Sequence, residues 1–317
     1  MERNAELALA AFGMPDAVPH LIRHNENRTY RVDTDRGSFC LRLKSPVEGF
    51  DLDVFDGEPE ALLRGEIALI ESVGRRTDIP VQRPVRTPDG DPVARLPDGT
   101  LASLLGWLDG ETYKDAETRT APMLRAAGEA LGRLKAASRT LPGLDKIVRC
   151  DYGPALIARL DARIASAGDT LPADDITSVR RTLEAVIRAM EADNAAGGRT
   201  VAHADPGLGN LVWTGGSAGL IDWSLSGTAP GHMDIGGLMG AVSDREEQRL
   251  LLEGYERIAG RTDRRALDAC FTLSVLLFVC CQHSRAREWD WFFPALQRWR
   301  ETIFDPFVEG RPVHCIL

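Results

Sequence analysis

The chain of 317 residues is long enough for one large domain or two modest ones, and its 44% hydrophobic and 27% charged residues are typical of a soluble globular protein. The net charge of −9 and the lack of a basic stripe argue against a nucleic-acid partner. Six cysteines occur without a C-x-x-C pair, which indicates reduced thiols in a cytoplasmic protein rather than disulfides or a metal cluster.

The sequence also argues against a membrane partner. The first twenty residues carry no basic region before an apolar core, so we expect no signal peptide. The longest apolar run, Ala269–Cys281, is too short to span a bilayer and predicts a buried helix. The oligomeric state is left open.

In chain order, the N-terminal part is predicted to be rich in strands. Residues 4–20 are expected to form a short amphipathic helix, and residues 21–43 an antiparallel hairpin around the turn Asp33–Gly37. A helix over 61–73 follows, and residues 102–108 are predicted to form the last strand of this part.

From residue 109 onward, helical periodicity replaces alternation. Residues 118–138 and 153–195 are predicted to be helical, with a break at Pro172, as are residues 243–317. The change of pattern predicts an N-terminal unit of residues 1–108 and a C-terminal unit of residues 109–317.

The stretch 201–237 interrupts the helices and carries the chemistry. It contains His203, Asp205 two residues later, Asn210 five residues after that, and Asp222. Two short apolar segments around Thr-Gly-Gly-Ser predict a hairpin that brings Asn210 and Asp222 side by side, with Asp205 directed at the same point. An amide oxygen beside a carboxylate suits Mg²⁺, and a second carboxylate can accept a proton from a hydroxyl. The spacing matches the catalytic loop of protein kinases.

With these residues the stretch resembles the signature of the aminoglycoside phosphotransferase and choline-kinase-like family, usually His-Gly-Asp-x-x-x-x-Asn followed by Ile-Asp-Trp or Ile-Asp-Phe. It departs from that signature at Ala204, where glycine is usual. The resemblance implies an α+β, two-lobed protein-kinase-like fold, with a small N-terminal β lobe that binds nucleotide and a larger helical lobe. It also implies transfer of the γ-phosphoryl group of ATP or GTP, with Mg²⁺, to a hydroxyl of a small molecule.

The same resemblance implies roles in the catalytic stretch. Asp205 orients or deprotonates the hydroxyl, His203 supports the loop, and Asn210 and Asp222 hold Mg²⁺. Asp234 braces the loop, although it is equally suited to cap the helix that follows.

For the nucleotide, the resemblance assigns roles in the N-terminal unit. Asn27 lies in the loop over the triphosphate. Arg42, or Lys44 on the same face of the strand, contacts the phosphates, and Glu66 pairs with that cation. Backbone groups of Leu105, Gly106 and Trp107, in the hinge that connects the two lobes, bind the nucleotide base.

The acceptor is expected to be cationic. Residues 48–60 contain six acids and no base, and residues 201–250 contain six acids and two bases, so a negative cleft is one interpretation and solvated acidic loops the other. An aminoglycoside fits the first interpretation. A metabolite kinase of homoserine, hydroxylysine or choline type, a nucleotide-binding protein without catalysis, and a metal hydrolase are the alternatives; the last lacks further histidine ligands at suitable spacing.

Overall fold

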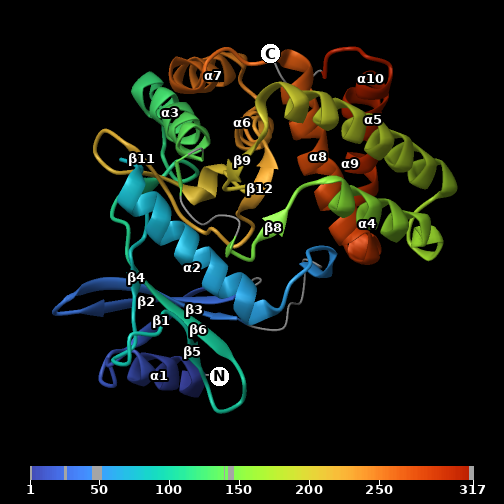
Figure 1. Cartoon of the computed structure of the whole chain (residues 1–317). Helices are drawn as coiled ribbons and strands as arrows, with labels where there is room; N and C mark the ends of the chain where they lie inside the picture. Colours follow the sequence, from blue (N-terminus) through green and yellow to red (C-terminus); the bar gives the residue numbers. More distant parts are fainter. Residues whose placement is uncertain (1, 25–26, 45–51, 139, 142–145, 314–317) are drawn as a thin grey trace.

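The computed structural model describes residues 2–24, 27–44, 52–138, 140–141 and 146–313. Residues 48–51 of the acidic segment therefore lie outside the described residues. Figure 1 shows a small sheet at the bottom of the view and a larger, mainly helical part above it.

The N-terminal part is built on an antiparallel sheet. Its strands run in the order β1-β2-β3-β6-β4, and β5 pairs with β6. Their bounds are β1 (Pro19–His24), β2 (Asn27–Thr34), β3 (Gly37–Lys44), β4 (Pro84–Val85), β5 (Ala94–Arg95) and β6 (Leu101–Gly106). The hairpin expected in this region is present as β2 and β3, and β1 adds a further strand to it.

The first helix, α1 (Glu2–Ala11), is shorter than predicted, and the predicted continuation to residue 20 is wrong. The chain leaves the helix at Gly13, whose φ of +75° is in the left-handed region, and the N–H of Met14 donates to the Leu9 carbonyl over 2.8 Å. A left-handed glycine directly after a helix is a frequent helix stop. Part of the remaining predicted helix, from Pro19 onward, belongs to β1 and pairs with β2 instead.

Helix α2 (Pro59–Arg76) lies between the sheet and the helical part (Figure 1). One face packs Leu63 and Ile67 against Val93 and Leu101 of the N-terminal part. Other side chains of α2 join the main core together with C-terminal helices. The helix therefore contacts both parts of the molecule.

The C-terminal part is mainly helical, with short strands around the catalytic stretch. The turn η1 (Leu52–Val54) precedes α2; the remaining elements are β7 (Glu111–Thr112), α3 (Ala121–Ala137), β8 (Cys150–Asp151), α4 (Pro154–Ala165), η3 (Ala167–Asp169), α5 (Ala173–Gly197), β9 (Arg199–Ala202), η4 (Leu208–Asn210), β10 (Leu211–Trp213), β11 (Ala218–Leu220), β12 (Gly227–Pro230), α6 (Met233–Gly240), α7 (Arg245–Ala259), α8 (Arg264–Gln282), η5 (His283–Glu288), α9 (Phe292–Trp299), η6 (Arg300–Phe304, a π-helical turn) and α10 (Asp305–Val308). The predicted break at Pro172 separates α4 from α5. The lobe boundary at residues 108 and 109 stays a prediction.

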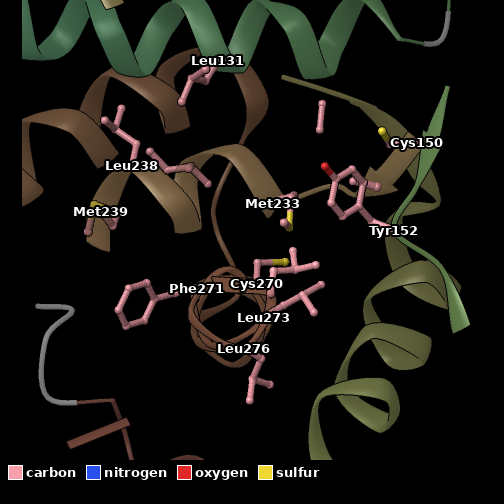
Figure 2. Close-up of a cluster of buried hydrophobic side chains, with 14 of the residues drawn as sticks. Leu131, Cys150, Tyr152, Met233, Leu238, Met239, Cys270, Phe271, Leu273 and Leu276 are labelled. Carbon is pink, nitrogen blue, oxygen red and sulfur yellow. The ribbon is translucent and has the colours of Figure 1, made fainter. Parts of the chain in front are cut away.

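Helix α8 forms the centre of the C-terminal core. Figure 2 shows Cys270 and Leu273 of α8 near Met233 of α6, with Tyr152 beside them. The segment Arg264–Glu288 has the length and composition of a membrane span, but 83% of its most apolar window is buried inside the protein. The predicted buried helix is therefore present within α8.

Candidate active site

The hairpin predicted in the catalytic stretch is present as β10 and β11. Leu211 lies opposite Leu220, and the N–H of Ile221 donates to the Asn210 carbonyl over 3.1 Å. Asn210 and Ile221 are thus at the same level of the hairpin, and Asp222 follows directly. This pairing explains how residues separated along the chain reach one site.

Asn210 and Asp222 line one pocket, and Asp205 is hydrogen-bonded to Asn210 beside it. The Asn210 side-chain amide donates to the Asp205 carboxylate and to the Asp205 carbonyl, each over 2.9 Å. Asn210, Asp222 and Arg42 all line a pocket of about 230 Å³ between the sheet and the hairpin. Asp205 itself is exposed at the surface of the loop. The arrangement leaves a carboxylate facing solvent beside the lined pocket.

Asp234 braces the turn between His203 and Asp205. Its two carboxylate oxygens accept the N–H of His203 (2.9 Å) and the N–H of Ala204 (2.7 Å). Ala204 has a φ of 65°, in the left-handed region that favours glycine. This conformation accounts for the glycine that is usual there in the resembling signature, and the turn forms here despite the methyl group.

His203 connects this turn to the strand that leads to Asp222. The ring is fully buried, and its Nε2 lies 2.9 Å from the Ile221 carbonyl. Because a carbonyl only accepts, Nε2 carries the proton. Burial lowers the pKa of His203, which keeps the ring neutral. The ring also packs against Trp223, with 4.8 Å between centroids. His203 therefore supports the loop rather than titrating in it.

Asp222 is held in an ionised state. Burial alone would raise the pKa of this carboxyl, but Arg42 and a hydrogen bond from Ser224 outweigh burial, and the pKa lies below its ordinary value. Ser224 Oγ donates over 2.9 Å, and Arg42 Nη2 lies 3.4 Å from Asp222 Oδ1. With a φ of 59°, Asp222 adopts a left-handed conformation that aspartate tolerates better than most residues.

Of the two cations expected near the phosphates, Arg42 lines the pocket and Lys44 does not. Its guanidinium pairs with Glu66 of α2, and both side chains are buried. Burial would lower the pKa of Arg42, but the nearby carboxylates Glu66 and Asp222 raise it. Lys44 is absent from the pocket wall, and burial lowers its pKa. The pairing that the sequence predicted for Glu66 is present, with Arg42 as the partner.

The hinge residues differ in what they offer to a base. Leu105 pairs with Cys40 within the sheet. The N–H of Gly106 donates to the Arg83 carbonyl over 2.7 Å, and that of Trp107 donates to the Ser38 carbonyl over 2.8 Å. The pocket is lined by Trp107 and by Leu108, one position beyond the predicted hinge set.

Several residues of the pocket wall were not predicted from the sequence. Among them are Ile22 and Arg23 of β1, Thr29, and Gln82, whose amide donates to the Gly106 carbonyl over 3.3 Å. Asn27, the first residue of β2, pairs with Lys44 and is not part of this wall. No local sequence signal marks Gln82, because its position depends on β4 pairing with β6.

The donor set fits a magnesium ion bound jointly with a nucleotide. The Asn210 N–H₂ group is used by Asp205, so the amide oxygen of Asn210 is directed elsewhere and is available as a ligand. Within the described ranges, no group of three or more His, Cys, Asp or Glu side chains has the arrangement of a metal site. An ion would therefore rest on Asn210, Asp222 and substrate oxygens, which is how Mg²⁺ is usually held.

Several acids of the acidic segments pair with arginines. Asp53 and Asp56 pair with Arg163 and Arg159 of α4. At the start of α7, Glu247 pairs with Arg119 over 2.9 Å. The acid counts that suggested a negative cleft therefore do not by themselves describe the charge of the site.

A family model described as the phosphotransferase enzyme family matches residues 20–270. No curated protein matches the sequence. Among solved structures, a microcompartment-associated aminopropanol kinase is similar with a TM-score of 0.78 and 18% identity over 99% of both chains. An amicoumacin kinase, solved with AMP-PNP and Ca²⁺, gives a TM-score of 0.70 and 16% identity over 94% of this chain and 90% of the other.

A spectinomycin phosphotransferase, solved with ADP and spectinomycin, gives a TM-score of 0.63 and 16% identity over 97% of this chain and 96% of the other. At these identities the likeness shows the fold alone. That fold is the predicted kinase-like arrangement, an N-terminal antiparallel sheet followed by a mainly helical part.

Proposed function

The chain belongs to the phosphotransferase enzyme family, and from that premise we propose that it transfers the γ-phosphoryl group of Mg²⁺·ATP to a hydroxyl of a small cationic acceptor. One observation carries the proposal. The Asn210 amide is fixed by the exposed Asp205 carboxylate while Asn210, Asp222 and Arg42 line a common pocket. A proton acceptor, a hard-oxygen pair and a cation thus stand next to one another, which is what phosphoryl transfer requires.

In the proposed reaction, Asp205 accepts the proton of the acceptor hydroxyl. The hydroxyl oxygen forms a bond to the γ-phosphorus, the bond from that phosphorus to the β–γ bridging oxygen breaks, and ADP leaves. Asp205 suits this role because it is exposed and its orientation is set by Asn210.

The phosphates are proposed to be placed by Arg42. Its charge is balanced by Glu66 and shared with Asp222, which fixes the guanidinium at the pocket wall. A bound Mg²⁺ would be held by Asn210 and Asp222 and would neutralise charge on the β and γ oxygens.

The base is proposed to lie against Trp107 and Leu108. Both line the pocket, whereas the N–H groups of Gly106 and Trp107 are already paired within the protein. Leu108 would then supply the backbone N–H, and the Gly106 carbonyl, which has a second lone pair beside the Gln82 contact, would accept from an exocyclic amine.

Two acceptor classes follow from different observations. The sequence favours an aminoglycoside-type antibiotic through the resembling family. A smaller amino alcohol is favoured by the similarity to the aminopropanol kinase over nearly the full length of both chains, and by the pairing of the acidic segments with arginines.

The test is steady-state ADP release with Mg²⁺·ATP over two panels, one of aminoglycosides and one of amino alcohols that includes aminopropanol, homoserine, hydroxylysine and choline. Each active compound is checked by mass spectrometry for one added phosphoryl group. Turnover confined to one panel identifies the acceptor class. Tight nucleotide binding without transfer to any compound contradicts the catalytic proposal and supports the non-catalytic alternative.

A further inference from the structure

The loop that follows Asp222 is bound at three residues by one guanidinium, that of Arg149. Arg149 Nε donates to the Ser226 carbonyl over 2.8 Å. Its Nη2 lies within hydrogen-bond distance of the Trp223 carbonyl (2.9 Å), the Ser224 carbonyl (2.7 Å) and the Ser226 hydroxyl (3.0 Å). The guanidinium thus fixes the backbone on the C-terminal side of the proposed metal ligand.

The same guanidinium reaches helix α2. Arg149 Nη1 donates to the Leu62 carbonyl over 2.7 Å. Leu62 lies one helical turn before Glu66, so this bond fixes the end of α2 that carries the partner of Arg42. Arg149 therefore touches both elements whose carboxylates meet at Arg42.

A close backbone contact holds α2 against the same segment. A Cβ at Gly65 would lie 2.1 Å from the Val148 carbonyl and 3.0 Å from Arg149 Cδ. Helix α2 thus rests directly on residues 148 and 149, at the position next to Glu66. The contact leaves little room for the helix to shift relative to Arg149.

Arg149 acts here through geometry rather than through an ion pair. Among the described residues no carboxylate pairs with it, and its partners are backbone carbonyls and one hydroxyl. A planar fork with five N–H donors serves several oxygens at once, whereas the ammonium of lysine offers three donors from one point.

We propose that Arg149 is a positioning residue that sets the separation of Glu66 and Asp222 across Arg42, and thereby the geometry in which Mg²⁺ and the triphosphate are held. The proposal rests on the proposed function, because it concerns the same nucleotide site. It adds a residue that contacts neither nucleotide nor ion and acts on both through the backbone.

The test is calorimetric binding of AMP-PNP, once with Mg²⁺ and once with EDTA. The ratio of the Kd in EDTA to the Kd in Mg²⁺ reports how much the metal contributes to nucleotide affinity. In Arg149→Met we expect this ratio to fall by about 10-fold to 100-fold, the usual loss when a residue supporting a metal ligand is removed. Arg149→Lys is expected to restore part of the loss. Arg180→Met, which removes an exposed ion pair with Asp161, is the matched control and should leave the ratio unchanged.

Thermal unfolding separates positioning from folding. A lower Tm in Arg149→Met with an unchanged Kd ratio would show a merely structural role and overturn the proposal. If that variant does not fold, Arg149→Lys is the test: it keeps the charge but loses the planar fork, and it should lower the ratio in the same direction by a smaller factor; no change in it would equally overturn the proposal. Failure of the unaltered protein to bind Mg²⁺·AMP-PNP would instead contradict the proposed function.

Discussion

The Asp234 carboxylate accepts the N–H of Ala204 over 2.7 Å, and its other oxygen accepts the preceding N–H of His203 over 2.9 Å. A side chain from the start of α6 thereby satisfies two successive buried donors of the turn that presents Asp205. The carboxylate is the group that makes this possible, because an amide has only one accepting oxygen.

Asp234→Asn is expected to lower the free energy of unfolding by about 1–3 kcal/mol, because one buried N–H loses its acceptor. Turnover should fall at least about tenfold, since a small displacement of Asp205 is costly for transfer. Urea unfolding and steady-state kinetics measure the two effects. Asp244→Asn is the matched control, because Asp244 caps α7 and asparagine caps equally well. Equal losses of stability and turnover in both variants would contradict the role of Asp234 in bracing the turn.

The pH dependence of the unfolding free energy should report the titration of Asp234. Burial raises the pKa of Asp234 to about 6, although the two N–H bonds oppose the shift. Between the unfolded value of 3.8 and the folded value, the folded state binds a proton that the unfolded state does not. The contribution of Asp234 to stability therefore rises as pH falls through 6, and it is lowest above that pH.

Measured as the difference in unfolding free energy between the unaltered protein and Asp234→Asn, this contribution should grow by about 2 kcal/mol from pH 7 to pH 4.5. The comparison cancels the opposite trend of carboxyls such as Asp222, whose pKa is lowered. A difference that stays constant or shrinks toward acid pH would show that the buried carboxyl does not titrate in this range.

Ala204→Gly should stabilise the protein slightly. An L-residue in the left-handed region costs about 1–2 kcal/mol, and the greater freedom of glycine in the unfolded chain removes about 0.4–1 kcal/mol of the gain. We expect an increase of up to about 1 kcal/mol in urea unfolding, with unchanged nucleotide affinity. A clear loss of stability would mean that the methyl group makes contacts that outweigh the backbone conformation.

Local pattern was sufficient to predict the centre of the site. The glycine turn between two apolar segments predicts the approach of Asn210 and Asp222 but leaves the register open by a residue, and the structure places Asn210 level with Ile221. The pairing of Glu66 with a strand cation was implied only through the family resemblance, and the structure selects Arg42 as that cation. The helix was predicted too long because the stop at Gly13, in the left-handed region, was not recognised.

Contacts between distant segments could not be predicted. Arg149 precedes a two-residue strand, β8, whose parallel pairing with β12 places the guanidinium under the loop after Asp222. Nothing in the neighbouring sequence indicates that pairing. The same holds for the arginines that pair with acids of the acidic segments, because Arg159 and Arg163 lie more than 100 positions from their partners.

The buried pair of Arg42 and Glu66 should be strongly non-additive. Glu66→Leu removes the buried carboxylate that pairs with the guanidinium and should cost about 3–5 kcal/mol of unfolding free energy. The double variant Arg42→Met with Glu66→Leu should recover part of that loss, because both buried charges of the pair are gone, while Asp222 loses the guanidinium that lowers its pKa. Both variants should lose AMP-PNP affinity, because Arg42 is displaced or absent. Additive stability losses would indicate that the pair is not desolvated.

The last prediction separates the two aspartates of the catalytic stretch. Asp205→Ala should leave nucleotide affinity within a few-fold of the unaltered protein, because Asp205 is exposed and is not part of the pocket wall. Turnover should fall by about 10²–10⁴, the usual contribution of a positioned proton acceptor. Asp222→Ala should instead weaken binding of Mg²⁺·AMP-PNP while changing metal-free binding less, because Asp222 lines the pocket beside Asn210.

Calorimetry with and without Mg²⁺, together with initial rates at saturating ATP, distinguishes these outcomes. Because Asn210 donates to Asp205, Asp205→Asn is the useful companion variant: it keeps the side-chain shape and an accepting oxygen but cannot take up the proton. Equal loss of turnover in Asp205→Ala and Asp205→Asn, with nucleotide affinity retained in both, points to proton acceptance. Substantial turnover in Asp205→Asn would assign Asp205 an orienting role and would require another group to receive the proton of the hydroxyl.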